Sequence, residues 1–243
     1  MKALITGASS GIGKDIAREM SRKGYDLILV ARREDRLIQL KEELKTNVEI
    51  ISMDVSSVEN CQKLYEQAKD VDILVNNAGF GIYGEFVDTD LNKEISMINT
   101  NIVAVHTLTK LFLQNMIKKN RGQILNVASI GGFMPGPLMA SYYATKSYIV
   151  RLSEGVREEL RKEKSNVKIS ILCPGPVDTE FNKVSGGKFN IHSLDSKYVA
   201  QYAVDKMLKG KFVIVPGILM KLVRVLTKIV PDNIISKFVY YVH

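Results

Sequence analysis

The stretch SYYATKSY, residues 141–148, combines three tyrosines with one lysine, side chains that can exchange protons with a substrate. A tyrosine hydroxyl has a pKa of about 10, so it exchanges protons poorly at neutral pH unless a nearby cation favours the phenolate. On a helix, side chains four residues apart project in similar directions, so Tyr142 and Lys146 would face one ligand. Tyr143 would project about 100° away, which favours a role in packing or in lining a pocket.

A glycine-rich turn, TGASSGIG at residues 6–13, lies between a short apolar run and a helical pattern. Gly7, Gly11 and Gly13 would permit a sharp turn and let a ligand approach the backbone. The free N–H groups at the start of the following helix would favour a pyrophosphate. A tight turn without a ligand is the alternative, but its place after the first strand favours a dinucleotide site.

Short apolar runs alternate with helical patterns along the chain. The fold that this alternation produces must position the glycine-rich turn and the Tyr142–Lys146 pair. Apolar strands separated by helices indicate a parallel sheet covered on both faces. We therefore predict an α/β doubly wound Rossmann fold in one domain with about seven parallel strands. Residues 1–217 would form the catalytic part, and residues 218–243 a basic amphipathic helical extension of it. Strands are expected at 2–6, 26–31, 48–53, 73–76, 123–129, 168–173 and 212–215, and helices at 11–22, 34–44, 61–68, 91–118, 142–163 and 196–208.

Four motifs in this order resemble the short-chain dehydrogenase/reductase family, of the NADP-preferring type, over about residues 1–215. They are the glycine turn, NNAG at residues 76–79, a serine that ends the fifth strand, and a tyrosine with a lysine four residues later. Tyr142 follows Ser129 by 13 residues and precedes Lys146 by four, as the family requires, whereas Tyr143 has a serine at the lysine position.

The resemblance implies a role for each of these residues. Tyr142 would protonate a carbonyl oxygen during reduction and take the proton back during oxidation. Lys146 would favour the phenolate and bind the nicotinamide ribose, and Ser129 would hold the substrate oxygen. Asn101, in INTNIV, would position a water near the lysine, and Asn99 is the competing register.

The end of the second strand predicts which dinucleotide binds. An acidic residue there would bind a ribose 2′-hydroxyl and repel a 2′-phosphate, but this chain has Ala31 followed by Arg32 and Arg33. A guanidinium group suits a phosphate, so we predict NADP(H), with Arg32 as the main contact and Arg33 or Ser9 as a secondary one. The alternative is that both arginines are solvated loop charges.

Other loops are expected to contact the cofactor by resemblance. Asp54, with Val55, would meet the adenine, although an Asp at a strand end also caps turns. The NNAG loop would lie against the cofactor, and it could equally brace the sheet. The full predicted set is Gly7, Ser9, Ser10, Gly11, Ile12, Gly13, Arg32, Arg33, Asp54, Val55, Asn77, Ala78, Gly79, Asn101, Tyr142, Lys146, Pro174, Gly175, Val177 and Thr179.

Two segments are expected to form the substrate pocket. Residues 130–140 are apolar but broken by glycine and proline, and residues 180–197 contain Gly186–Gly187, which suggests a lid. An apolar carbonyl or alcohol follows as a hypothesis: a steroid or bile acid, an acyl chain or an aromatic ketone. Ordinary packing is the alternative for the apolar residues of the first segment, Phe133, Met134, Leu138 and Met139.

The C-terminal segment is basic and amphipathic. Lys221, Arg224 and Lys228 recur on one helical face before Pro231, and residues 233–242 could form another helix. Such a segment can lie on an anionic membrane, a peripheral contact. The alternative is an arm that docks on its own subunit or on a partner and covers the substrate mouth.

Composition excludes several other classes of function. The net charge is +8, but no nucleic-acid motif accompanies it, so no nucleic-acid partner is predicted. Cys61 and Cys173 show no metal-ligand spacing and no disulfide framework, so no metal is expected. Neither a signal peptide nor a run long enough to span a membrane is visible, and we expect a cytoplasmic protein.

The sequence thus predicts an NADP(H)-dependent oxidoreductase that interconverts a carbonyl and a secondary alcohol on a small apolar molecule. Similar proteins are usually homodimers or homotetramers. One alternative is a membrane-associated lipid or ketoacyl reductase. Another is an NADP-binding regulatory protein with little turnover, although such a protein would not need a proton donor.

Overall fold

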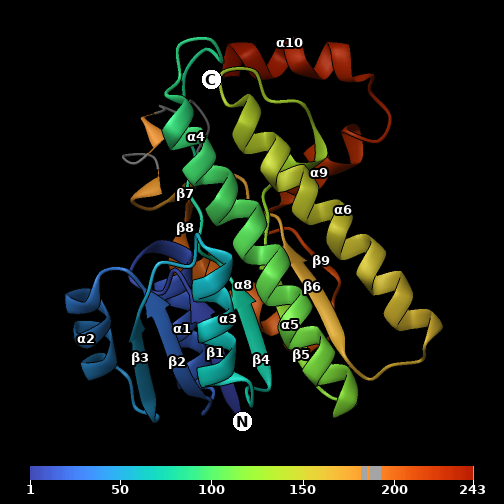
Figure 1. The fold of residues 1–243 in the computed structure, drawn as a ribbon. Coiled ribbons are helices and arrows are strands. Elements are labelled where there is room, and N and C mark those ends of the chain that lie inside the picture. Colours follow the sequence, from blue (N-terminus) through green and yellow to red (C-terminus); the bar gives the residue numbers. More distant parts are fainter. Residues whose placement is uncertain (182–184, 187–192, 243) are drawn as a thin grey trace.

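The computed structural model describes residues 1–181, 185–186 and 193–242, and a sheet of seven parallel strands lies at its centre (Figure 1). The strand order is β3-β2-β1-β4-β5-β6-β9, so the chain winds outward in both directions from β1 and β4. This confirms the predicted doubly wound Rossmann fold. The strands are β1 Lys2–Thr6, β2 Asp26–Ala31, β3 Val48–Ser52, β4 Ile73–Asn76, β5 Gln123–Val127, β6 Lys168–Leu172 and β9 Val213–Ile214.

The central strands are apolar throughout because both of their faces are buried. Successive side chains of a strand point to opposite faces. In β1, Ala3 and Ile5 therefore join the core on one face of the sheet, while Leu4 joins the core on the other. Both cores are covered by helices, as the uninterrupted apolar runs predicted.

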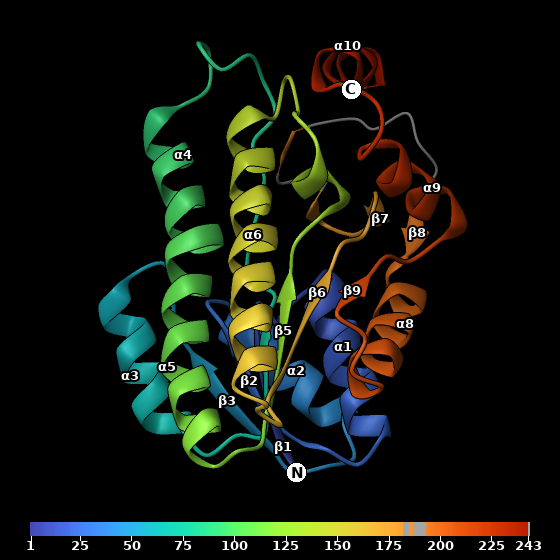
Figure 2. The same ribbon diagram turned by 90° about the vertical axis from the view of Figure 1, so that its right-hand side faces the viewer.

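Helices cover both faces of the sheet, with α1 and α8 on one side and α3, α5 and α6 on the other (Figure 2). The first layer packs through residues such as Ile16 of α1 and Val204 of α8, and the second through Leu64 of α3 and Phe112 of α5. The helices are α1 Gly11–Arg22, α2 Glu34–Glu43, α3 Val58–Ala68, α4 Leu91–Ile98, α5 Val105–Lys118, α6 Ala140–Lys162, α8 Ser196–Leu208, α9 Ile218–Leu226 and α10 Asp232–Val242.

The predicted single helix over residues 91–118 is interrupted. A π-helical turn, η1 Asn99–Ala104, separates α4 from α5. Such turns often occur at functional sites, and sequence periodicity does not reveal them. The predicted fifth strand is also too long: β5 ends at Val127, and Ser129 instead caps the 3₁₀ turn η2 Ile130–Phe133.

Two short elements near the site were not predicted. Strands β7 Val177–Asp178 and β8 Leu194–Asp195 pair in parallel and form a small second sheet. They frame the segment expected to act as a lid, but Gly187 and much of residues 180–197 lie outside the described residues.

The C-terminal segment forms two helices, α9 and α10, above the carboxyl ends of the strands (Figure 1). Lys221 and Lys228 are exposed, but Arg224 turns inward, with its guanidinium 5.2 Å from the Phe133 ring centroid. The three cations therefore do not share one face. No helix among the described residues is both long and apolar enough to cross a membrane.

Candidate active site

The glycine-rich turn after β1 packs closely against the loop after β4. Gly7 and Gly11 have φ values of +66° and +54°, a conformation that glycine adopts without strain. A Cβ on Gly7 would lie 2.8 Å from the Ala78 Cα, and a Cβ on Gly13 would clash with the Asn77 amide. The turn therefore needs glycine for two reasons, its backbone angles and its contact with the neighbouring loop.

A cavity of about 720 Å³ runs along the carboxyl ends of the strands. Gly13 and Asn101 are the two predicted cofactor residues that do not line it; Gly13 packs behind the turn, and Asn101 is fully buried. The predicted cofactor residues that line it are Gly7, Ser9, Ser10, Gly11, Ile12, Arg32, Arg33, Asp54, Val55, Asn77, Ala78, Gly79, Tyr142, Lys146, Pro174, Gly175, Val177 and Thr179.

The two arginines after β2 have different surroundings. Arg33 donates hydrogen bonds to the hydroxyls of Ser9 and Ser10, at 3.0 and 2.8 Å, and forms a 2.9 Å ion pair with Glu180. Arg32 has a side chain that is 71% exposed, with its nearest carboxylate, that of Asp54, at 3.7 Å. The structure thus brings Arg33 to the glycine-rich turn and leaves the Arg32 guanidinium in solvent.

Glu180 is held by two guanidinium groups. Arg36 of α2 donates to one carboxylate oxygen at 2.6 Å, while Arg33 binds the other. Hydrogen bonds from Arg36, and then from Arg33, hold the pKa of Glu180 below its ordinary value. This carboxylate lies at the predicted 2′-phosphate end of the cavity, and sequence reasoning did not single it out.

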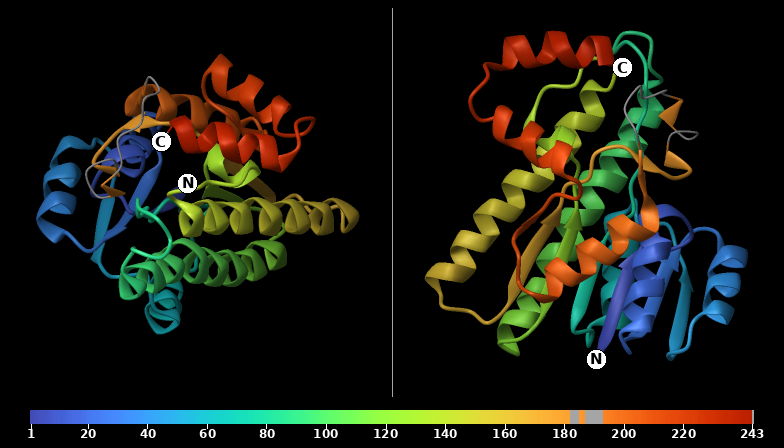
Figure 3. Two further views of the ribbon diagram at one scale, coloured as in Figure 1. Left: turned by 90° about the horizontal axis from the view of Figure 1, so that it is seen from above. Right: turned by 180° about the vertical axis from the view of Figure 1, so that it is seen from behind.

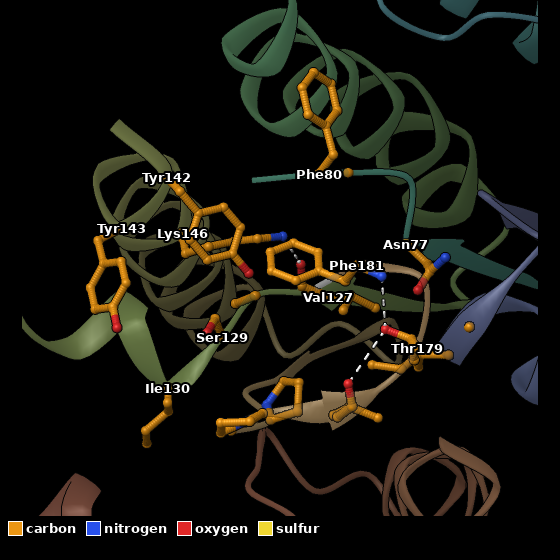
Figure 4. Close-up of a pocket in the computed structure, with 18 of the residues that line it drawn as sticks. Asn77, Phe80, Val127, Ser129, Ile130, Tyr142, Tyr143, Lys146, Thr179 and Phe181 are labelled. Atoms are coloured by element: carbon orange, nitrogen blue, oxygen red, sulfur yellow. Dashed lines mark hydrogen bonds between the residues drawn. The ribbon is translucent and has the colours of Figure 1, made fainter. Parts of the chain in front are cut away.

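Tyr142 and Lys146 both reach the cavity from α6, with the lysine Nζ 5.7 Å from the centroid of the tyrosine ring (Figure 4). Ser129 lines the same cavity from the start of η2, and its Oγ accepts a hydrogen bond from the N–H of Gly131 at 3.1 Å. The predicted serine, tyrosine and lysine therefore meet in one place. Lys146 also donates to the backbone carbonyl of Val127 at 2.9 Å, at the end of β5.

Burial controls the protonation of this pair. Withdrawal from solvent raises the pKa of Tyr142 above its ordinary value, and a hydrogen bond with Ser129 works in the opposite direction. Burial lowers the pKa of Lys146 to about 8. The sequence argument considered only the lysine charge, whereas desolvation has the largest effect on the pKa of Tyr142 in this structure. Tyr142 therefore carries its proton at neutral pH.

Asn101 lies in the π turn and braces the site from behind. Its side chain accepts from the N–H of Phe80 at 3.1 Å, donates to the carbonyl of Phe80 at 2.9 Å, and donates to Thr145 Oγ1 at 3.1 Å. A Cβ added to Gly79 would lie 2.8 Å from the amide oxygen of Asn101 and 3.6 Å from the Lys146 Nζ. Asn101 is thus buried behind the loop that carries Gly79 and Phe80, and neither it nor Asn99 lines the cavity among the described residues.

The other two tyrosines of the SYYATKSY stretch have different surroundings. Tyr143 lines the cavity but packs against Gly131 and Gly136, and burial raises the pKa of its hydroxyl to about 12. The hydroxyl of Tyr148 lies 2.8 Å from the Nδ1 atom of His106 on the exposed side of the helix. Neither has a lysine placed as Lys146 is to Tyr142.

The substrate end of the cavity is apolar, but its walls differ from those expected. Met134 and Met139 line it, whereas Phe133 and Leu138 are not among the described residues that do. Phe181 reaches into the cavity, with its ring centroid 5.2 Å from that of Tyr142 (Figure 4). The C-terminal helices supply the remaining wall, through Met220, Val223, Leu226, Thr227, Val230, Ile234, Ile235, Phe238 and Val239.

Met220 shows how closely the C-terminal helices approach the predicted cofactor loop. A Cβ on Gly175 would lie 2.5 Å from the Met220 sulfur, so the two segments are in direct contact. The arm thus docks on its own subunit and covers the cavity, which was one of the two interpretations of its sequence.

A glycine-rich turn that begins a doubly wound sheet and a cavity that leads from it to a serine, tyrosine and lysine define a Rossmann-fold oxidoreductase. The family model for short chain dehydrogenases matches residues 1–188. The chain therefore belongs to the short-chain dehydrogenase family, which confirms the resemblance seen in its motifs.

Individual proteins of known sequence or structure support the same assignment. The human very-long-chain 3-oxoacyl-CoA reductase is 35% identical over 196 residues, which cover 75% of this chain and 61% of that protein. A short-chain dehydrogenase from Sphingobium yanoikuyae, solved with NADPH, is 27% identical, with a TM-score of 0.83 and coverage of 95% of this chain and 96% of that one.

A second solved structure carries the other dinucleotide. A short-chain dehydrogenase/reductase from Burkholderia phymatum, in complex with NAD, is 25% identical, with a TM-score of 0.84 and coverage of 93% and 92%. Together with the family, these structures support a nicotinamide cofactor and an enzyme that acts on CH–OH or C=O groups. Because one neighbour carries NADPH and the other NAD, the preference between the two dinucleotides has to be argued from the residues of this chain.

Proposed function

We propose that this protein is an NADP(H)-dependent reductase that interconverts an apolar ketone and its secondary alcohol. The observation that carries the proposal is the convergence of Ser129, Tyr142 and Lys146 on one cavity, between an arginine-lined end and an apolar end. A long-chain 3-oxoacyl compound is the substrate class that we favour, because the human relative named above is a 3-oxoacyl-CoA reductase.

The residues present fit an NADP cofactor. The glycine-rich turn leaves backbone accessible at the start of α1, where N–H groups favour a pyrophosphate. Arg32 and Arg33 follow β2, which ends in Ala31 instead of the acidic residue that would repel a 2′-phosphate. We assign Arg32 as the main phosphate contact because its guanidinium is free to turn, and Arg33 as the second.

We assign two tasks to the side chains of this protein, which are to orient the substrate carbonyl and to transfer a proton to its oxygen. When bound, the reduced nicotinamide supplies a hydride to the carbonyl carbon. Ser129 uses an oxygen lone pair for the Gly131 N–H, so its own proton can hold the substrate oxygen. Tyr142 keeps its proton at neutral pH and donates it to that oxygen. Lys146 lies beside the tyrosine and stabilises the phenolate left behind.

Turnover and cofactor titration test the proposal. NADPH and NADH are titrated separately, and 3-oxoacyl thioesters, ketosteroids and aryl ketones are then screened by loss of the reduced nicotinamide absorbance. We expect tighter binding of NADPH and a loss of turnover of about 10²-fold or more in Tyr142→Phe.

Tyr143→Phe is the matched control, because its ring lies next to that of Tyr142 with centroids 6.1 Å apart. Its turnover should stay within about threefold of the wild type, since Tyr143 transfers no proton. Undiminished turnover in Tyr142→Phe would overturn the assignment of the acid. NADPH binding without turnover of any of these ketones would favour a regulatory NADP-binding protein.

A further inference from the structure

The C-terminal helices present an apolar surface to solvent in addition to the face that lines the cavity. Met220 and Val223 of α9 line the cavity, whereas the opposite side of this helix is exposed, from 55% for Val225 to 77% for Ile218. Helix α10 lies on the outside of the molecule (Figure 3), and its apolar residues Phe238 and Tyr241 are 69% and 84% exposed. We call these exposed residues the tail surface: Ile218, Leu219, Leu222, Val225, Leu226, Ile229, Ile234, Phe238, Tyr240 and Tyr241.

Positive charge borders the tail surface. Lys221, Lys228 and Lys237 are exposed, and among the described residues none of the three forms an ion pair with a carboxylate. Asp232 is the single acidic residue of the segment from residue 218 onward. Lysine can lay its alkyl stem on apolar surface while its charge stays in water, and tyrosine favours the boundary between the two.

Two occupants could cover such a surface, a second copy of the chain or a lipid surface. A two-fold interface would place the same positive surface of both copies against each other, which like charges disfavour. Anionic lipid headgroups would neutralise these lysines, while the apolar side chains enter the region just below the headgroups. The charge of the tail surface therefore favours lipid.

The cavity opens at the tail surface. Leu226, Ile234 and Phe238 line the cavity, yet they remain 54%, 55% and 69% exposed. They therefore form its rim, where the apolar substrate end meets the outside. A substrate dissolved in a bilayer could pass this rim without crossing water.

We propose that the tail surface binds anionic membranes and that the apolar substrate enters the cavity from the lipid through this rim. The helices lie on the membrane and do not cross it, since α9 has 9 residues and α10 has 11. The entry route rests on the proposed function, but binding to lipid is measured without turnover, so either can fail alone.

Vesicle binding tests the surface. The full chain is sedimented with vesicles of phosphatidylcholine alone or mixed with phosphatidylglycerol, at low and high salt. We expect binding to the mixed vesicles that is at least about tenfold stronger than binding to the neutral ones and that weakens with salt. The double variant Leu222→Glu, Ile229→Glu should lose this binding; neither residue lines the cavity among the described residues.

Ile38→Glu on α2 is the matched control, because Ile38 is also an exposed isoleucine and its helix lies apart from α9 and α10 (Figure 1). It should bind vesicles like the wild type, and NADPH binding reports that all variants are folded. Equal binding of wild type and double variant, or no binding to the anionic vesicles, overturns the proposal. A change of the double variant from dimer to monomer, with no vesicle binding by the wild type, would assign the surface to a second copy instead.

A second readout tests the entry route. Reduction of a long-chain ketone embedded in vesicles should fall at least about tenfold in the double variant, while reduction of a short water-soluble ketone stays unchanged. Equal loss with both ketones would show that the substitutions damage the site itself and would overturn entry through the lipid side.

Discussion

Arg33 and Glu180 lie 147 residues apart in the chain and form an ion pair whose N–O distance is 2.9 Å. The pair joins the end of β2 to the loop that follows β7, so the end of the cavity where we place the adenosine is tied to the segment that carries Phe181. A 2′-phosphate and the Glu180 carboxylate would compete for the same guanidinium group.

Removing this carboxylate charge should therefore strengthen NADPH binding. We expect Glu180→Gln to bind NADPH about 2–5-fold more tightly, the range given by exposed ion pairs, and NADH as the wild type does. Fluorescence titration of both dinucleotides measures this difference. Asp178→Asn is the matched control, because Asp178 is exposed and nearby. Weaker NADPH binding in Glu180→Gln would mean that Glu180 orients Arg33 productively.

Arg32 and Arg33 should differ in how much each contributes to the affinity for NADPH. Arg32→Ala is expected to weaken NADPH binding by about tenfold, because charge-assisted contacts to phosphate are strong and its exposed guanidinium has only a loose ion pair with Asp54, at 3.7 Å. Arg33→Ala should cost less, because Glu180 already engages Arg33. NADH binding should change little in both variants. A larger loss in Arg33→Ala would reverse the assignment of the main phosphate contact.

Burial of Lys146 should reduce the stability of the folded chain at neutral pH. Its pKa falls from 10.5 to about 8, so between these values the unfolded chain binds more protons and stability rises with pH. Below pH 8 the desolvation of Lys146 lowers the free energy of unfolding by about 3 kcal/mol, because each pH unit between the two pKa values contributes about 1.4 kcal/mol.

Lys146→Met should therefore be more stable than the wild type at pH 7, and the difference should shrink as pH rises towards 10.5. Urea unfolding at several pH values measures it. A variant that is less stable at pH 7 would show that the hydrogen bond to Val127 outweighs the desolvation of the charge.

Asn101 should matter for stability as well as for the site. Asn101→Ala leaves both backbone groups of Phe80 without their partner, and we expect a loss of about 2–3 kcal/mol in the free energy of unfolding. Asn99→Ala in the same turn should stay within about 0.5 kcal/mol. Urea denaturation compares the two, and equal losses would show that the turn itself, rather than the amide contacts, is responsible.

The general architecture followed from the sequence because it depends on local patterns. Apolar runs such as that of β1 are continuous because both faces are buried, and Gly7 lies where a positive φ is needed. The Tyr142–Lys146 pair could be placed because four residues make about one helical turn.

Other features could not be predicted because they depend on contacts between distant segments. The ion pair of Arg33 with Glu180 follows from the position of the loop after β7. Phe133 faces Arg224 rather than the cavity because α9 packs over it. The pKa of Tyr142 depends on how much solvent the surrounding elements exclude, and the sequence argument considered only the lysine charge.

The π turn at Asn99–Ala104 limits which deletions the chain can tolerate between α4 and α5. Such a turn acts as one extra residue in a helix, so deleting a single residue within it would restore regular α-helical spacing. Because the π turn absorbs the extra residue, that deletion would leave α4 and α5 in their present orientation but would shift Asn101 within the turn and separate its amide from Phe80. The site therefore depends on the number of residues in this turn. A one-residue deletion here would displace Asn101 even if every named side chain were kept.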